Sequence, residues 1–467
     1  MYIQDTICAI ATAPGGAIGI IRVSGPDAII ITNRIFVPTA SPIPLTERKP
    51  YTLTFGEIVD EQKEIVDEVL VSLFHAPHSY TGEDSTEISC HGSPYILQKI
   101  MQLLIDQGCR SAKAGEYTQR AFLNGKMDLS QAEAVADLIA STSEAAHHLA
   151  LNQMRGELSR ELGKLRNQLL HLTSLMELEL DFSDHEDLEF ANRSELQILA
   201  AQVESLINHL VESFSTGNAI KNGIPVAIIG DTNTGKSTLL NALVGDERSI
   251  VSNIHGTTRD IIEDTINIQG ITFRFIDTAG IRQTDDAIET LGIERSFKAL
   301  KQAKIVILMY DLQRPSDDFY VFYQKIQSHL ANKQIILVMN KCDLVSNIPV
   351  HLPEKIAQTL IPQSNIVTVS AKQKISIDRL LSLLVTIVNL PEITHRNIIV
   401  TNIRHYEALT HALKSIHRVQ KGISINLPND LISQDLRECI FHLSDIVGEV
   451  TTDAVLENIF KHFCVGK

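Results

Sequence analysis

"GDTNTGKST", residues Gly230 to Thr238, lies between the apolar run "PVAII" and the helical pattern "LLNALVG". It matches the motif GxxxxGK(S/T) in the strand, loop and helix context that gives this motif its meaning. Glycines in such a loop let backbone N–H groups surround phosphate oxygens, and the N-terminus of the following helix adds positive potential. We expect Lys236 to reach the outer phosphates and the Ser237 hydroxyl to bind magnesium. The stretch therefore predicts a nucleotide-binding P-loop, without distinguishing ATP from GTP.

The sequence around this loop, from about residue 221 to 390, alternates apolar runs with polar helical segments. The runs are "IPVAIIG", "ITFRFIDTAG", "KIVILMYD", "QIILVMNKCD" and "NIVTVSAK". Nearly continuous apolar strands separated by helices indicate a mostly parallel sheet covered on both faces. We therefore predict a mostly parallel α/β domain over residues 221–390.

Two later motifs indicate the base. Asn340, Lys341 and Asp343 in "NKCD" come at a strand end, where the carboxylate of Asp343 can accept hydrogen bonds from guanine N1–H and the 2-amino group. Adenine offers no such pair of donors and would leave this carboxylate unpaired. "SAK", Ser370 to Lys372, follows the next strand and can offer backbone N–H groups to the guanine carbonyl. These motifs favour GTP.

Two further motifs are expected near the γ-phosphate. "DTAG", Asp277 to Gly280, ends a strand and is expected to bring Asp277 near magnesium and Gly280 near the γ-phosphate. Thr258 in "GTTRD" is a candidate second hydroxyl ligand of magnesium. Five motifs in this order predict a Ras-like P-loop GTPase domain. The GTP-binding residues predicted from these motifs are Asn233, Thr234, Gly235, Lys236, Ser237, Thr238, Thr258, Asp277, Thr278, Ala279, Gly280, Asn340, Lys341, Asp343, Ser370, Ala371 and Lys372.

The residue that would orient the attacking water is not evident. Ras-like GTPases use a Gln just after the "DTAG" glycine, whereas Ile281 occupies that position. Either hydrolysis is slow or another group positions the water; Glu289 is a candidate, and a solvated helix cap is the alternative for it. Arg259 and Arg282 are candidate arginine fingers or surface residues. The Asn233 amide oxygen could hold a monovalent cation against the phosphates.

The chain on either side of this domain has different patterns of apolar residues. From the start to about residue 108, short β-branched runs alternate with turn signals, and the helical "PYILQKIMQLLIDQG" follows, which indicates an α+β domain. Between about residues 115 and 214 apolar residues recur at helical spacing, and helical periodicity returns from about residue 401, as in Leu436, Ile440, Leu443 and Val447. In the first helical region the recurring residues are Leu151, Met154, Leu158, Leu162, Leu165, Leu169 and Leu172.

The simplest architecture inserts the α/β domain into a helical domain whose two halves pack together. The predicted domains are residues 1–118 (α+β), 119–220 (first helical half), 221–390 (inserted) and 391–467 (second helical half). At 467 residues, several domains are the expectation.

Composition excludes several classes of protein. The six cysteines are scattered without a CxxC pair, and the apolar runs are too short to span a membrane, so we expect reduced thiols, no membrane and a cytoplasmic location. The net charge of −15 argues against a chain-wide nucleic-acid surface but not against a local basic patch. The acidic stretch from Glu177 to Glu189 is interpreted as a solvated helix end, with a metal site as the weaker alternative.

The chain ends on "FCVGK", Phe463 to Lys467. Gly466 and Lys467 do not fit a prenylation box, which leaves Cys464 as a buried, incidental or nucleophilic thiol. The preceding apolar pattern "AVLENIFKHF" predicts a helix that docks in the helical domain and holds the tail in place.

Several stretches resemble one family. They are "DTICAIATAPGGAIGIIRVSG", "SYTGEDSTEISCHG", "GEYTQRAFLNGKMDLSQAEAVADLI", "NTGKSTLLNAL", "GTTRD" and the terminal "FCVGK". Together they extend over the whole chain, which resembles the MnmE (TrmE) family of tRNA modification GTPases. The resemblance implies a folate-binding N-terminal domain that dimerises, a helical domain, and an inserted G domain.

The same resemblance implies an activity. The family works with an FAD-dependent partner, MnmG (GidA), in a heterotetramer. It modifies C5 of the wobble uridine of certain tRNAs to an aminomethyl or carboxymethylaminomethyl group, using 5-formyl- or methylene-tetrahydrofolate. Potassium makes its G domains dimerise and activates GTP hydrolysis.

The resemblance also assigns residues. Potassium would be held by Asn233, Ser252, Ile254 and Thr257, and magnesium by Ser237 and Thr258. Glu289 would orient the water. The switch loop adds GTP-binding residues Ser252, Asn253, Ile254, His255, Gly256 and Thr257. Folate would be bound by Arg22, Glu87, Lys126 and Lys467, with Cys464 and Lys467 at the modification site.

The departures from the family pattern are modest. Asp231 and Thr232 stand where the family more often has other residues, commonly Pro at the second position. Asp231 adds negative charge beside a phosphate site, so we expect nucleotide affinity below that typical of the family.

A ribosome-assembly GTPase is the alternative class of protein, but no basic RNA-binding appendage is evident in the sequence. A membrane-associated switch is a third interpretation, and no membrane anchor supports it.

Overall fold

The computed structural model describes most of the chain. The described residues are 5–13, 15–39, 41–181, 193–245, 264–276, 298–345, 365–388, 398–450, 452–461, 463 and 466. The chain forms two compact units. One unit consists of Met1–Ile139, Asn152–Glu204 and Ala408–Lys467, and the other of Ala140–Leu151 and Ser205–Glu407.

The first unit begins with a seven-stranded sheet in the order β3-β4-β5-β6-β2-β1-β7. Its strands are β1 (Ile7–Ile10), β2 (Ile18–Ser24), β3 (Phe36–Pro38), β4 (Leu53–Val59), β5 (Ile65–Phe74), β6 (Ser85–His91) and β7 (Arg110–Ser111). Only β1 and β7 pair in parallel; the other neighbouring strands are antiparallel.

Two helices, α1 (Ala28–Ile35) and α2 (Pro94–Asp106), pack on this sheet and share one apolar core with it. β5 alternates between faces: Val69, Val71 and Leu73 are buried in that core, whereas Leu70 is exposed. A strand with this alternation covers a core with one face only. The α+β prediction is confirmed.

Helices follow the sheet, as predicted. They are α3 (Glu116–Leu123), α4 (Leu129–Ala140), α5 (Glu144–Met154), α6 (Glu157–Asp181) and α7 (Arg193–Asn222). The predicted apolar stripe divides, because the chain turns at Gly156 with a φ of +75°. Leu151 and Met154 therefore belong to α5 and are half-buried, while the stripe from Leu158 to Leu172 is the buried face of α6.

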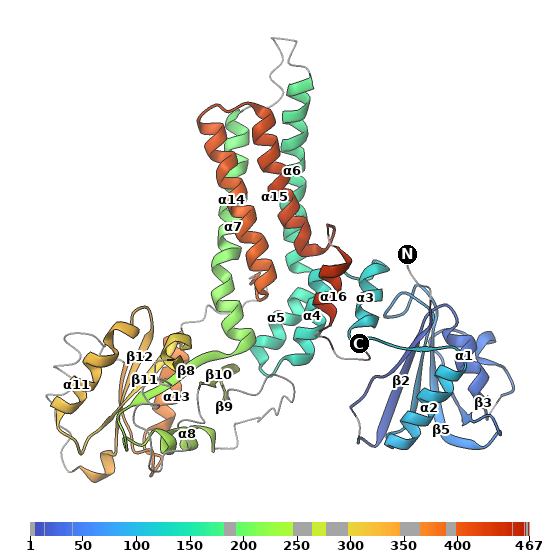
Figure 1. Ribbon diagram of the computed structural model, residues 1–467, viewed down its shortest axis with the longest axis horizontal. Coiled ribbons are helices and arrows are strands. Elements are labelled where there is room, and N and C mark those ends of the chain that lie inside the picture. The colour runs from blue at the N-terminus through green and yellow to red at the C-terminus, as the bar shows by residue number, and fades with distance from the viewer. Residues whose placement is uncertain are drawn as a thin grey trace. The chain divides into compact units, whose positions relative to one another are not determined.

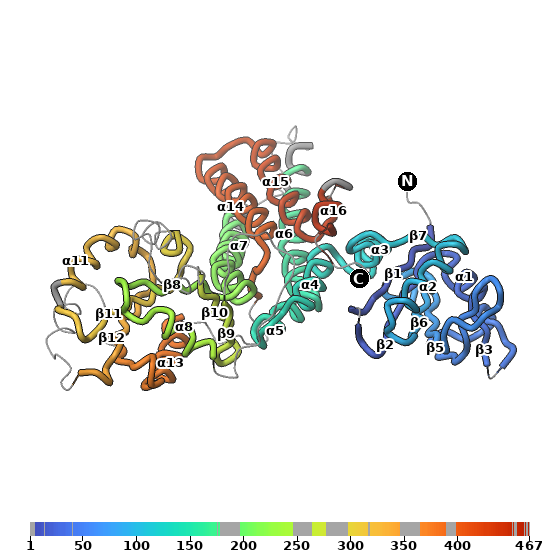
Figure 2. The backbone as a smooth tube through the Cα atoms, turned by 60° about the horizontal axis from the view of Figure 1, so that its bottom comes forward, coloured from blue at the N-terminus to red at the C-terminus, as the bar shows by residue number. Residues whose placement is uncertain are grey.

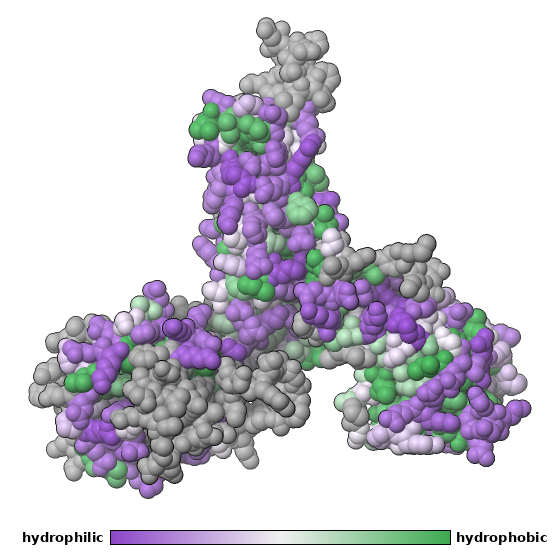
Figure 3. Space-filling model, viewed as in Figure 1, coloured by the Kyte–Doolittle hydropathy of each residue, from purple (hydrophilic) through white to green (hydrophobic). Residues whose placement is uncertain are grey.

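The C-terminal helices are α14 (Ile403–Ser424), α15 (Asn429–Val447) and α16 (Asp453–Phe460). α6 packs along α15, and Arg437 of α15 pairs with Glu177 of α6. Arg166 of α6 also pairs with Glu449, just beyond the end of α15. The two helical segments, separated in sequence by the α/β domain, therefore pack together (Figure 1). Hydrophilic side chains cover most of the visible face of these long helices (Figure 3).

The α/β domain contains a six-stranded sheet in the order β13-β12-β11-β8-β10-β9. Its elements are β8 (Ile224–Gly230), α8 (Lys236–Val244), β9 (Asp264–Ile268), β10 (Ile271–Phe275), β11 (Ile305–Asp311), α11 (Ser316–Ile326), β12 (Gln334–Asn340), β13 (Ile366–Thr368) and α13 (Ile377–Val388). Only β9 and β10 are antiparallel.

Each face of this sheet has its own apolar core. Helices α8 and α13 lie on one side of the sheet and α11 on the other (Figure 2). All seven residues of β11 are buried: Ile305, Ile307 and Met309 face one core, and Val306 and Leu308 face the other. Parallel strands covered on both faces need such continuous apolar sequence. Within the described residues, no helix is long and apolar enough to cross a membrane.

Candidate functional site

The P-loop connects the end of β8 to the start of α8. Gly235 precedes α8 with a φ of +94°, and Asn233 adopts a φ of +59°, a conformation that asparagine tolerates better than most residues. A Cβ at Gly235 would collide with Asn340 Nδ2. The loop therefore needs glycine there for two reasons, its backbone conformation and the close approach of Asn340.

Lys236 directs its ammonium group into this loop. Its Nζ donates to the carbonyl oxygens of Gly230 at 2.9 Å and Asp231 at 2.7 Å. Burial lowers the pKa of Lys236; the charge of Asp231 opposes this shift and that of Arg314 adds to it. Ser237 and Thr238 follow in the first turn of α8.

Asn340 joins three predicted motifs. It is 2% exposed, its Nδ2 donates to the Thr234 carbonyl at 2.8 Å, and its Oδ1 accepts from the Ala371 N–H at 3.0 Å. The "NKCD" asparagine thus connects the P-loop to the "SAK" loop. Its sequence context suggested a contact with the base, and this bracing arrangement could not be read from sequence spacing.

Lys341 and Asp343 lie at the same edge of the sheet. Lys341, with a φ of +66°, donates from Nζ to Asp311 Oδ2 at 2.6 Å. Asp343 is half-buried and accepts from Gln373 Nε2 at 3.4 Å, and the backbone N–H of Gln373 donates to Ser370 Oγ at 3.2 Å. The carboxylate expected to read guanine therefore lies beside the "SAK" loop. Lys372 is exposed.

Asp311 is a part of this site that sequence reasoning missed. It ends β11, is 3% exposed, and its carboxylate accepts from Lys341 Nζ and from the Gln313 N–H at 3.0 Å. The available signal was an aspartate ending an otherwise apolar strand.

Many predicted residues lie outside the described part of the chain. They are Ser252, Asn253, Ile254, His255, Gly256, Thr257, Thr258, Asp277, Thr278, Ala279, Gly280, Glu289, Cys464 and Lys467. Their assignments remain predictions.

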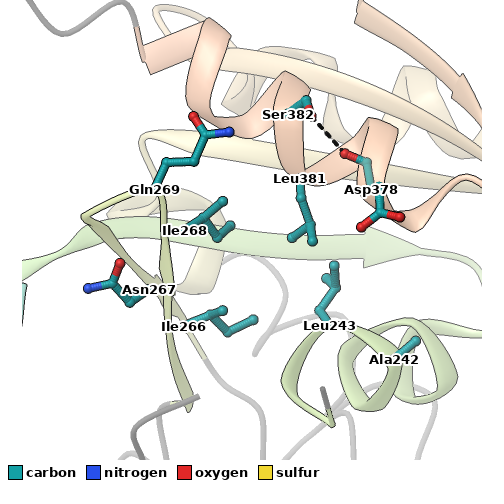
Figure 4. Close-up of a pocket in the computed structure, with 9 residues that line it drawn as sticks. All are labelled: Ala242, Leu243, Ile266, Asn267, Ile268, Gln269, Asp378, Leu381 and Ser382. Carbon is teal, nitrogen blue, oxygen red and sulfur yellow. Dashed lines mark hydrogen bonds between the residues drawn. The ribbon is translucent and has the colours of Figure 1, made fainter. Parts of the chain in front are cut away.

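A cavity of about 400 Å³ lies elsewhere in the same domain. Leu243 of α8, Ile266 and Ile268 of β9, and Leu381 of α13 give it apolar walls, as Figure 4 shows. Leu243 is at the opposite end of α8 from Lys236, so this cavity is not the P-loop.

A second group of predicted residues meets on the N-terminal sheet. Arg22 of β2 is the register partner of Glu87 of β6, and its Nε and Nη2 donate to Glu87 Oε1 at 2.9 and 2.7 Å. The guanidinium lies over the rings of Tyr80 and Tyr117, with centroids 5.4 and 5.7 Å away. Burial raises the pKa of Tyr80, and its hydrogen bond with Thr118 and the charge of Arg22 reduce the shift. Both tyrosines were missed from sequence.

Lys126 and the C-terminal tail approach the same region. Lys126 Nζ donates to the Pro77 carbonyl at 2.8 Å, and a Cβ on Gly82 would lie 3.3 Å from Lys126 Cγ. Residues 77–82 form the loop that also carries Tyr80. From the tail, the Gly466 carbonyl accepts from Arg22 Nη1 at 3.4 Å. Arg22 and Lys126 thus both contact this loop, and Arg22 also binds Glu87 and the tail.

These features define a P-loop GTPase domain: the P-loop is bound to the "NKCD" and "SAK" motifs and lies on a mostly parallel six-stranded sheet. In the sequence, this domain is inserted between two helical segments that follow an α+β domain. Residues 129–464 match the family model described as the MnmE helical domain, and residues 6–126 match the one described as GTP-binding protein TrmE N-terminus. The chain belongs to the MnmE family of tRNA modification GTPases.

Relatives match along their whole length. The tRNA modification GTPase MnmE of Parabacteroides distasonis is 65% identical, covering 99% of this chain and 100% of the relative. The Bacteroides fragilis protein of the same name is 62% identical, covering 99% of this chain and 100% of the relative. The Flavobacterium johnsoniae protein of the same name is 49% identical, covering 100% of both chains. A crystal structure of Aquifex aeolicus Era bound to GDP and AlF4− is 29% identical over 41% of this chain and 65% of that chain, with a TM-score of 0.27, too low to support an argument.

The predicted fold class and the predicted GTP hydrolase acting in tRNA modification are confirmed by these matches.

Proposed function

We propose that this chain hydrolyses GTP to control the conformation of a complex that modifies C5 of the wobble uridine of certain tRNAs. The product is an aminomethyl or carboxymethylaminomethyl group. The complex is a cytoplasmic heterotetramer of a homodimer of this chain with the FAD-dependent subunit MnmG (GidA). The observation that carries the proposal is the Arg22 and Glu87 pair, which the C-terminal tail reaches at Gly466. Mass spectrometry of wobble uridines after deletion of the gene tests it; unchanged nucleosides would contradict the function.

The residues around Arg22 suit a tetrahydrofolate derivative. A guanidinium and an ammonium, from Arg22 and Lys126, can pair with an anionic glutamyl tail, while the Glu87 carboxylate can accept from a pterin ring. Tyr80, which is half-buried, gives the same place aromatic surface. Lys467 is proposed as a further contact. When bound, 5-formyl- or methylene-tetrahydrofolate would supply the one-carbon unit.

Direct titration with 5-formyl-tetrahydrofolate tests this site independently of tRNA modification. Glu87→Ala is expected to weaken binding at least tenfold, since a hydrogen bond to a charged group such as this half-buried carboxylate contributes roughly 1.5–3 kcal/mol. Glu57→Ala, a glutamate on β4 of the same sheet, is the matched control and should bind as the parent does. Equal affinities for both variants would refute the folate site.

Cys464 is proposed to act at the modification site. Its described neighbours support this: Phe463 packs near Gly115, and Gly466 lies against the backbone of Ile10 and Ala11. Cys464→Ser is expected to abolish tRNA modification while folate affinity is retained. Full modification by this variant would exclude a nucleophilic thiol.

GTP hydrolysis is proposed to depend on potassium, held by Asn233, Ser252, Ile254 and Thr257. Asn233 supports this because its side chain is exposed on the P-loop. Magnesium is assigned to Ser237 and Thr258, which would let it neutralise phosphate charge.

Glu289 is proposed to orient the attacking water, and hydrolysis is coupled to dimerisation of the G domains. Hydrolysis rates in KCl and NaCl test the ion, and equal rates would exclude a potassium mechanism. Asn233→Ala is expected to lose the potassium dependence but keep GDP binding, with Gln324→Ala on α11 as an exposed amide control.

Homodimerisation is proposed to use the exposed face of the N-terminal sheet. Leu53 and Phe55 on β4 and Ile65 and Leu70 on β5 are 38 to 60% exposed, and Phe55 is the register partner of Leu70. An apolar face of this kind marks an interaction site. Phe55→Lys should convert dimer to monomer in light scattering, whereas Tyr95→Lys, on α2 of the covered face, should not. If the Phe55→Lys variant were still a dimer, this face would be excluded as the dimer interface.

A further inference from the structure

Asp231, the second residue of the P-loop, brings a carboxylate to a loop that must accept an anion. The side chain is 48% exposed and forms an ion pair with Arg314 Nη1. Arg314 Nη2 also donates to the Thr232 carbonyl at 2.8 Å. The guanidinium therefore spans two consecutive P-loop residues, with one terminal nitrogen on each.

The turn after β11 holds Arg314 in this position. The Arg314 N–H donates to the Asp311 carbonyl at 3.0 Å, and its own carbonyl accepts from the Tyr310 hydroxyl. Asp311 is in turn bound by Lys341 of the "NKCD" motif. These contacts fix the backbone of Arg314, so that its side chain begins within reach of Asp231 and Thr232.

Both charges of the pair act on the residue that is expected to contact the phosphates. The Asp231 charge raises the pKa of Lys236 and the Arg314 charge lowers it, against the larger lowering caused by burial. The two side chains are therefore close enough to alter the potential inside the loop. Without Arg314, the carboxylate of Asp231 would repel a nucleoside triphosphate.

We propose that Arg314 is a positioning residue for GTP binding: its guanidinium neutralises Asp231, so that this acidic P-loop accepts an anionic nucleotide. Arg314 acts through Asp231, because each of its terminal nitrogens binds an oxygen atom of the P-loop. The expectation of a lowered nucleotide affinity considered the charge of Asp231 alone, without the ion pair that Arg314 forms with it.

Equilibrium binding of GTP and of a fluorescent GDP analogue to the full chain tests the proposal. Arg314→Ala should weaken GTP binding roughly tenfold at low ionic strength, with a smaller loss for GDP, which carries less charge. The loss should shrink as choline chloride is added at constant KCl, because exposed charges are screened. Arg314→Lys should retain most of the affinity. Arg379→Ala, an exposed arginine on α13, is the control.

The double variant Asp231→Ala with Arg314→Ala separates charge compensation from a purely structural role. It should return GTP affinity to within about threefold of the parent, because both charges are gone. A double variant as weak as Arg314→Ala would overturn the proposal, as would parental affinity in Arg314→Ala itself. Should Arg314→Ala fail to fold by circular dichroism, Asp231→Ala decides: it should bind GTP more tightly, and weaker binding would contradict the proposal.

Discussion

At the scale of single residues, the P-loop depends on Gly235. Gly235→Ala would place a Cβ against Asn340 Nδ2 and impose a left-handed conformation costing roughly 1 kcal/mol or more. We expect at least a tenfold loss of GTP affinity in an equilibrium titration, because Asn340 must move away from Thr234.

Gly270→Ala is the matched control for this substitution. It has a φ of +80° in the same domain, but the nearest atom to its Cβ, on Glu144, is 3.7 Å away. It should lose stability through backbone strain and leave GTP affinity unchanged. Equal losses of affinity in the two variants would mean that strain alone, and not the collision with Asn340, is responsible.

At the scale of elements, two helix-interior glycines should respond in opposite ways to alanine. In α6 a Cβ at Gly163 meets no atom within 4 Å, whereas in α7 a Cβ at Gly217 would collide with the Val400 carbonyl. Gly163→Ala should stabilise the chain by roughly 0.5–1 kcal/mol, since alanine is the better helix former. Gly217→Ala should destabilise it. Urea unfolding measures both, and a destabilised Gly163→Ala would contradict the open space seen beside α6.

α3 is joined to the N-terminal strands by a network of ion pairs around Arg120. Arg120 pairs with Asp5, Glu83 and Glu116, and its side chain is 11% exposed. Arg120→Ala should cost about 3 kcal/mol, because it leaves half-buried carboxylates without their partner. Arg34→Ala, an exposed arginine of the same domain, should cost little. Chemical denaturation measures the difference, and equal losses would refute the network's contribution.

The same network predicts a pH dependence. Burial alone would raise the pKa of Asp5 and Glu116, but hydrogen bonds from Arg110 and Arg120 lower both values below the ordinary range. A carboxyl group with a lowered folded-state pKa stabilises the fold above its unfolded pKa of about 4, and loses that contribution as pH falls through the folded value. Unfolding below about pH 4 should therefore become easier in the parent, and Arg120→Ala should flatten this dependence. If the free energy of unfolding depended on pH equally in Arg120→Ala and in the parent, this prediction would be wrong.

At the scale of the whole molecule, the C-terminal helix and the P-loop belong to different compact units. Phe460 of α16 is 2% exposed and packs with Leu129 and Ala132 of α4. Phe460→Ala should destabilise the unit containing the N-terminal sheet by about 3–4 kcal/mol through the cavity it leaves. Hydrogen exchange should show the loss in α4 and α16, while GTP affinity stays at the parental value.

Val455→Ala, 38% exposed on the same helix, is the control and should cost less than about 1 kcal/mol. A loss of GTP affinity in Phe460→Ala would contradict the independence of the two units.

The sequence by itself determined the elements and the GTPase motifs. Period-two alternation and uninterrupted apolar runs are local consequences of burying one or both faces of a strand, so β5 and β11 could be read directly. The P-loop could also be predicted from local sequence, because its left-handed backbone conformation requires glycine at position 235. The apolar stripe from Leu151 to Leu172 was predicted as one helical face, but the chain turns at Gly156, between the end of α5 and the start of α6.

Only the tertiary structure decided which side chains share a charge or a hydrogen bond. Asn340 bridges Thr234 and Ala371, and Arg314 neutralises Asp231 across 83 positions of sequence. Tyr80 lies against Arg22, which the tail reaches at Gly466. Such contacts depend on strand order and loop path, which bring together residues whose spacing along the chain carries no signal of their meeting.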